Sequence, residues 1–150
     1  MSATHEALPV ALPVGPQEAI EIPFWEGLRA GELRIQHCGA CDWWIWSPSW
    51  ICPKCHSFDP PWESVRPRGT VYSWTTTFHA FPASQEFRDA VPYTTALVEL
   101  PDAGGRRLLG IVTGRAPVQT GARVVGWVQP ASDLTGGWAV LRWTTDVEDQ

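Results

Sequence analysis

The chain of 150 residues is long enough for one ordinary domain, or for a small module fused to a compact one. Hydrophobic residues make up 44% and charged residues 18%, a balance that is globular rather than disordered. The net charge is −5 with a single lysine, Lys54, so the basic stripe of a nucleic-acid binder is missing and we expect no nucleic-acid partner.

The sequence also contains no recognisable membrane span or signal peptide. No run approaches the roughly 20 apolar residues of a membrane span, and the N-terminus lacks the basic and apolar regions of a signal peptide. We therefore predict a cytoplasmic protein without a membrane partner. In a reducing compartment, paired cysteines are more often metal ligands than disulfides.

The first 22 residues are expected to form a flexible tail. This stretch has no helical period and carries three early prolines, Pro9, Pro13 and Pro16. Such a segment becomes ordered, if at all, against a partner.

A short helix is predicted over 23–32. Pro23 suits the first turn of a helix, and Gly31 suits its C-terminal stop. Phe24, Trp25 and Leu28 fall on one face. That face packs on its own domain in one interpretation, and docks on another subunit in the other.

Residues 33–64 contain all four cysteines and are predicted to form a zinc ribbon. Two C-x-x-C pairs, Cys38/Cys41 and Cys52/Cys55, are separated by ten residues. A C-x-x-C turn lets two thiolates converge on one ion, and a hairpin between the pairs returns the second turn to the first. The prediction is a four-sulfur, structural zinc site, although spacing alone does not distinguish zinc from iron.

The backbone around these cysteines gives two further expectations. Asp42 and His56 follow the two turns, where a left-handed conformation is common, and both residue types tolerate it. Residues 43–46 and 50–51 are expected to form the two arms of the hairpin, with the turn at 47–49. The ten tryptophans of the chain exceed what a small core needs, so we expect some to line a groove or a partner surface.

Residues 65–150 are predicted to form a five-stranded barrel with a C-terminal tail. Period-two alternation marks half-buried strands. It puts Tyr72, Trp74 and Phe78 on one face of the first strand, and similar triplets in the second and last. The predicted strands are 70–78, 93–100, 107–113, 122–129 and 138–144. Five strands and no long helix favour a small closed barrel, of which the OB-fold is the best-known case.

Few residues outside the cysteines are candidates for chemistry. His37 and His56 flank the cysteine turns, so they are interpreted as groups outside the ligand shell. His79 follows an aromatic strand and is a candidate functional histidine or a surface loop residue. Glu99 is interpreted as a paired strand carboxylate. Because no nucleophile–base motif is present, we predict no catalytic residue in this chain.

Two arginines, Arg66 and Arg68, lie on either side of Pro67 at the start of the predicted barrel. One interpretation is an anion site, for example for a CoA phosphate. The other is a solvated pair. The sequence leaves both open, and no cofactor-binding residue is assigned.

The order of motifs resembles the DUF35 family of acyl-CoA-associated zinc-ribbon/OB-fold proteins. A Phe-Trp helix (PFWEGLRAGEL) runs into RIQHCGACDWW and CPKC, and then into a barrel with VPYTTALVEL and RRLLGIVTG. The similarity extends over roughly residues 20–145. The departures are Asp42 and His56, where glycine is common, and a Trp-rich cysteine module.

The resemblance implies an accessory role rather than a free-standing enzyme. It implies a hetero-oligomer with a thiolase-superfamily aldolase or thiolase subunit, built around a partner dimer and acting on an acyl-CoA. A steroid side-chain retro-aldolase is the preferred case, because a sterol-like acyl group suits a Trp-lined surface. The alternatives are a MaoC-like enoyl-CoA hydratase as partner and, from another class, single-stranded nucleic-acid binding.

Overall fold

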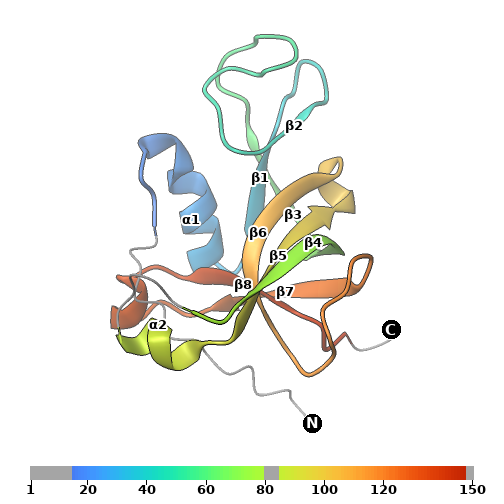
Figure 1. Ribbon diagram of the computed structural model, residues 1–150. Coiled ribbons are helices and arrows are strands. Elements are labelled where there is room, and N and C mark those ends of the chain that lie inside the picture. The colour runs from blue at the N-terminus through green and yellow to red at the C-terminus, as the bar shows by residue number, and fades with distance from the viewer. Residues whose placement is uncertain (1–14, 80–84, 148–150) are drawn as a thin grey trace.

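The computed structural model describes residues 15–79 and 85–147, arranged as a short helix, a ribbon and a barrel (Figure 1). The predicted tail over 1–22 therefore lies largely outside the described residues. A 3-10 turn, Ala19–Glu21, leads into the helix α1, Ile22–Arg29, with Pro23 in its first turn. Gly31 follows with a φ of 80°, a left-handed conformation that ends the helix at little cost. The predicted short helix is confirmed.

Helix α1 packs on its own domain through Phe24 and Leu28, which are both buried. Trp25 is half-buried and meets Trp138 at 6.2 Å between ring centroids. On the next turn, Arg29 lies 4.4 Å from the Trp138 ring centroid and donates to the Gly137 carbonyl. The helix thus joins the core that the ribbon base and barrel share, so the interpretation in which this face packs on its own domain holds for Phe24 and Leu28, while Trp25 keeps part of its surface exposed.

The ribbon is a three-stranded antiparallel sheet in the order β2-β1-β3. It consists of β1 (Leu33–His37), β2 (Trp44–Ile45) and β3 (Trp62–Val65). Above this sheet in Figure 1, the cysteine-containing loops form what we call the finger, residues 38–59.

The two arms predicted within the finger do not pair with each other. Trp44 and Ile45 pair with the end of β1, and Ile51 forms an isolated bridge with Phe58. The buried amide of Gln36 explains the difference. It accepts the Ser49 N–H at 2.8 Å and donates to the Ser49 and Pro60 carbonyls, so it ties the loop between the cysteine pairs to β1.

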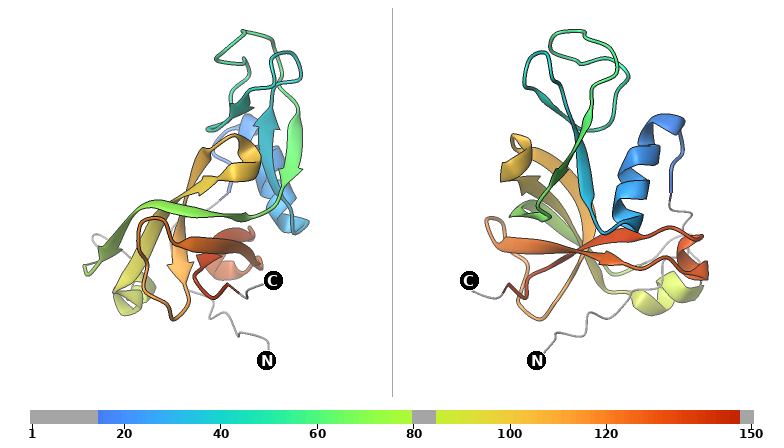
Figure 2. Two further views of the ribbon diagram at one scale, coloured as in Figure 1. Left: turned by 90° about the vertical axis from the view of Figure 1, so that its right-hand side faces the viewer. Right: turned by 180° about the vertical axis from the view of Figure 1, so that it is seen from behind.

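The second module is a closed five-stranded barrel, as predicted, and its strand order is β4-β5-β6-β8-β7 (Figure 2). All neighbours are antiparallel except β6 and β8, which pair in parallel at Val112–Trp143. The five predicted strands are confirmed with small shifts at their ends. They are β4 (Arg68–Thr77), β5 (Tyr93–Leu100), β6 (Arg106–Thr113), β7 (Arg123–Gln129) and β8 (Val140–Thr144).

Two features of the barrel differ from the prediction. A six-residue helix, α2 (Gln85–Ala90), lies between β4 and β5. In β4 a bulge between Val71 and Ser73 breaks the alternation, and Tyr72, Trp74 and Phe78 are all exposed. Among the described helices, none is long and apolar enough to span a membrane.

Two tryptophans attach the finger to the barrel. Trp44 lies against the turn after β5, where a Cβ on Gly104 would be 2.8 Å from its ring. The Trp43 ring lies 4.8 Å from both the Lys54 ammonium and the Arg106 guanidinium, so it links the finger to β6. These contacts fix the metal-site module relative to the barrel.

Candidate metal centre

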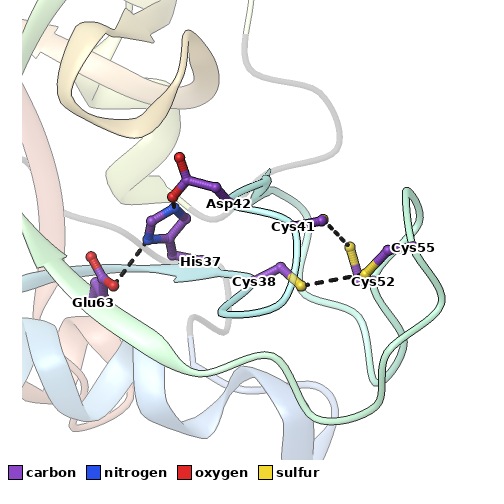
Figure 3. Close-up of polar contacts among 7 residues, drawn as sticks. All are labelled: His37, Cys38, Cys41, Asp42, Cys52, Cys55 and Glu63. Carbon is purple, nitrogen blue, oxygen red and sulfur yellow. Dashed lines mark hydrogen bonds and ion pairs between the residues drawn. The ribbon is translucent and has the colours of Figure 1, made fainter.

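The four thiols converge at the centre of the finger (Figure 3). Their sulfur atoms all lie within 4.8 Å of one another. The Cys38–Cys55 and Cys41–Cys52 sulfurs are 3.6 Å apart, far longer than the roughly 2.05 Å of a disulfide bond. The structure thus brings together the four residues that the spacing singled out.

Two matching backbone turns present these thiols. In the first, the Cys38 N–H donates to Trp43 and the Cys38 carbonyl accepts from Asp42, both at 2.9 Å. In the second, Cys52 makes the equivalent bonds with Ser57 and His56, again at 2.9 Å. Asp42 and His56 have φ values of 61° and 63°, so the predicted left-handed conformation is confirmed at both positions.

The sulfur arrangement fits a tetrahedral metal ion. Four ligands at about 2.3 Å from an ion are separated from one another by about 3.8 Å. The 3.6 Å sulfur separations are close to that edge length. Zinc held in this way is structural, because four thiolates fill its shell and leave no open position.

The electrostatics of the cluster also favour a bound cation. The Ser57 hydroxyl, assisted by the Ala40 and Cys41 N–H groups, lowers the pKa of the Cys38 thiol to about 6. In contrast, burial and the other three thiols raise the pKa of Cys41 to about 12. Four thiolates this close repel one another, so full ionisation of the cluster needs a positive ion among them.

Ser57 is a functional residue that sequence reasoning missed. Its hydroxyl lies 3.1 Å from the Cys38 sulfur and 3.2 Å from the Cys55 sulfur, and so joins the two cysteine turns. It also lowers the pKa of the Cys55 thiol. The sequence signal that could have identified Ser57 is a hydroxyl residue two positions after the last cysteine.

We expect Ser57→Ala to weaken metal binding about tenfold, because loss of an outer hydrogen bond to metal ligands typically has an effect of this size. Competition with a chromophoric zinc chelator measures the affinity. Ser64→Ala is the matched control, since the Ser64 hydroxyl bonds Glu32 and not sulfur. Equal affinities for the two variants would show that Ser57 does not support the ligands.

His37 lies beside the cluster and braces the first turn. Its ring is 2.9 Å from Glu63 on β3 and 2.7 Å from Asp42, and it stacks on Trp44 with centroids 4.1 Å apart (Figure 3). Burial lowers the pKa of His37, but the two carboxylates outweigh it and the net shift is upward. As predicted, this histidine lies outside the sulfur shell.

The other candidates are placed apart from the metal centre. Arg66 and Arg68 both bond Asp102, at 2.8 and 3.3 Å, so each already has an anionic partner within the chain. Glu99 pairs with Arg107 at 2.9 Å, which confirms its interpretation as a paired strand carboxylate. His79 is exposed just after β4, and the next residues of its loop are not described.

The fold and the site define a class: a four-thiol ribbon, with a helix at its base, attached to a closed five-stranded barrel. Comparison with known proteins agrees. Residues 25–61 match the domain family described as "ChsH2, rubredoxin-like zinc ribbon domain", and residues 62–129 match "ChsH2, C-terminal OB-fold domain". The chain therefore belongs to the DUF35 family, with the zinc-ribbon and OB-fold domains of ChsH2.

Two solved structures are similar to this chain in shape. A chain of the structure described as "Ltp2-ChsH2(DUF35) aldolase" is 28% identical, with a TM-score of 0.74, over 89% of this chain and 100% of that one. A DUF35-family protein of unknown function from Sulfolobus solfataricus is 19% identical, with a TM-score of 0.59, over 85% of this chain and 86% of that one, and shares the fold. No curated protein matches the chain.

The zinc ribbon identified in this way contains all four cysteines, and their arrangement is that of a structural zinc site. The zinc prediction is therefore confirmed at the level of the cofactor. The assignment of each individual thiol as a ligand stays a prediction.

Proposed function

We propose that this chain is the non-catalytic accessory subunit of a cytoplasmic, hetero-oligomeric CoA-thioester C–C lyase or thiolase-type complex. The observation that carries the proposal is the match to the Ltp2-ChsH2(DUF35) aldolase chain along that chain's whole length, together with both ChsH2 domains. The preferred reaction is retro-aldol cleavage of a steroid side chain. The catalytic groups then belong to a thiolase-like partner, arranged as a central dimer.

This subunit would contribute through a rigid, metal-stabilised finger and an exposed aromatic surface. Cys38, Cys41, Cys52 and Cys55 would hold a zinc ion whose shell is closed, so the metal stabilises the finger rather than activating substrate. The finger also exposes Trp50 and Phe58, at 57% and 79% of their surface. Large exposed apolar side chains mark interfaces, and aromatic ones suit a sterol-like acyl group. A subunit that completes a cleft accelerates a reaction by positioning, without an acid or base of its own.

The test is acyl-CoA cleavage by this chain, by a thiolase-like partner, and by the two after co-expression. We expect a stable complex and cleavage only by the complex, because positioning and chemistry are divided between the subunits. A steroid acyl-CoA aldol adduct is the first substrate to assay, with release of the shortened ketone or aldehyde as the readout.

Three results would contradict the proposal. Turnover by this chain alone at the rate of the mixture would make it an enzyme. A partner as active alone as in the mixture would leave this chain without a part in the chemistry. Assembly with a MaoC-like hydratase instead, or salt-sensitive binding of a single-stranded oligonucleotide, would favour the alternative functions.

A further inference from the structure

A small groove lies where helix α1 meets the finger. It has a volume of about 140 Å³ and is open to solvent. The last residue of the 3-10 turn, two residues from the start of α1 and three from the loop after β2 line it, namely Glu21, Phe24, Trp25, Trp46, Ser47 and Pro48. The groove thus spans two elements that the shared core holds in place.

Aromatic rings form most of its wall. The Phe24 ring is 4.9 Å from that of Trp46 and 5.4 Å from that of Trp25, measured between centroids. Phe24 is buried, whereas Trp25 and Trp46 keep part of their surface exposed. Three converging aromatic side chains attract both apolar groups and cations, because the faces of aromatic rings carry negative partial charge.

Glu21 gives the groove its charge. Its carboxylate accepts the Gln17 backbone N–H at 2.8 Å, and within residues 15–79 and 85–147 it has no ion pair with a cation. Covering this carboxylate with a purely apolar partner would remove it from water without compensation. The occupant that complements the lining therefore combines an aliphatic stem with a positively charged head.

We propose that this groove receives an arginine or lysine side chain of the partner subunit. A volume of about 140 Å³ accommodates one long side chain rather than a helix or a strand. The stem would lie along Trp25 and Trp46, and the head would lie between the indoles and Glu21. The identity of the occupant as a subunit residue rests on the proposed function, whereas the chemistry of the groove does not.

The experiment uses the full chain loaded with zinc and two small probes. N-acetyl-arginine methylamide carries the expected side chain, and N-acetyl-citrulline methylamide is its neutral isostere. Binding is followed by the indole N–H signals in heteronuclear NMR spectra, with Trp25→Phe and Trp46→Phe used to assign the two signals. We expect the arginine probe to shift both signals and to bind about fivefold more tightly than the citrulline probe.

Glu21→Gln should reduce that preference to what the aromatic rings alone provide and leave the indole signals otherwise in place, since the side chain is at the surface. Glu26→Gln is the matched control, an exposed carboxylate within α1 that does not line the groove. Equal binding of both probes, a preference that Glu21→Gln leaves undiminished, or no shift at Trp25 and Trp46 would each overturn the proposal. These outcomes do not depend on a complex. Failure here therefore differs from failure to assemble or to cleave acyl-CoA, which would count against the proposed function.

Discussion

Replacing Cys52 with serine is expected to release the metal and unfold the finger while the barrel stays folded. Cys52 is fully buried, and the apolar cluster of the finger otherwise contains only Cys38 and Ile45 as buried members. So small a core does not stabilise 22 residues of loop by itself, and the metal supplies what is missing. Structural zinc contributes roughly 10 kcal/mol or more in small modules of this kind.

The core that the barrel shares with α1 and the ribbon base is a different cluster, which includes Leu28, Val98 and Trp143. For this reason, NMR signals of residues 38–59 should collapse in Cys52→Ser while those of the barrel strands remain. Elemental analysis should give about one metal per wild-type chain and almost none for the variant. X-ray absorption of the wild-type metal should show sulfur alone. Retained metal in the variant, or a nitrogen or oxygen ligand in the wild type, would contradict the four-thiol assignment.

The metal centre could be predicted from the sequence because its chemistry depends on local spacing. Two C-x-x-C turns place four thiols with little help from the rest of the chain. The types of the residues that follow these turns also indicated the left-handed backbone there. The residues that support the ligands were harder to predict from the sequence. Ser57 is near its sulfurs in sequence, but Glu63 reaches His37 only because β3 pairs with β1 in a particular register.

The barrel strands illustrate the limit of periodicity. Strand β5 was predicted well, because its three buried residues, Ala96, Val98 and Leu100, alternate with half-exposed ones. Strand β4 extends past its pairing with β7, which ends at Thr70, so its later aromatic residues have no core to enter. No local pattern reports where a neighbouring strand stops.

Strand β8 shows the opposite case, in which both faces are buried. The predicted face of Ala139, Leu141 and Trp143 is in the core, yet Arg142 is only 3% exposed. Its guanidinium donates to Gln129 at 2.9 Å, and burial lowers its pKa to about 10, so it still carries its charge at neutral pH. From the sequence alone, a buried arginine is assigned to the surface, because charged side chains are rarely buried.

A last feature that spacing did not reveal is how closely β4 and β5 approach at Gly69. A Cβ built there would lie 2.2 Å from the Glu99 carbonyl oxygen and 2.8 Å from a Val98 methyl group. The oxygen belongs to the backbone of a paired strand, so it cannot move aside as a flexible side chain would. Gly69 also pairs with Val124 of β7, at the point where the barrel closes.

We therefore expect Gly69→Ala to lower the free energy of unfolding by about 3 kcal/mol, the upper end of the usual cost of overpacking. Urea denaturation of the zinc-loaded chain, followed by far-ultraviolet circular dichroism, measures the loss. Gly39→Ala is the matched control, because a Cβ at Gly39 meets no heavy atom within 4 Å and should change stability by less than about 0.5 kcal/mol. Displacement of β4 by this clash should loosen its pairing with β7, so exchange of the Gly126 amide, which donates to the Pro67 carbonyl beside that pairing, should accelerate in Gly69→Ala alone. Equal stability of the two variants would mean that the strands separate at Gly69 without cost, and that closure at this point does not hold the barrel together.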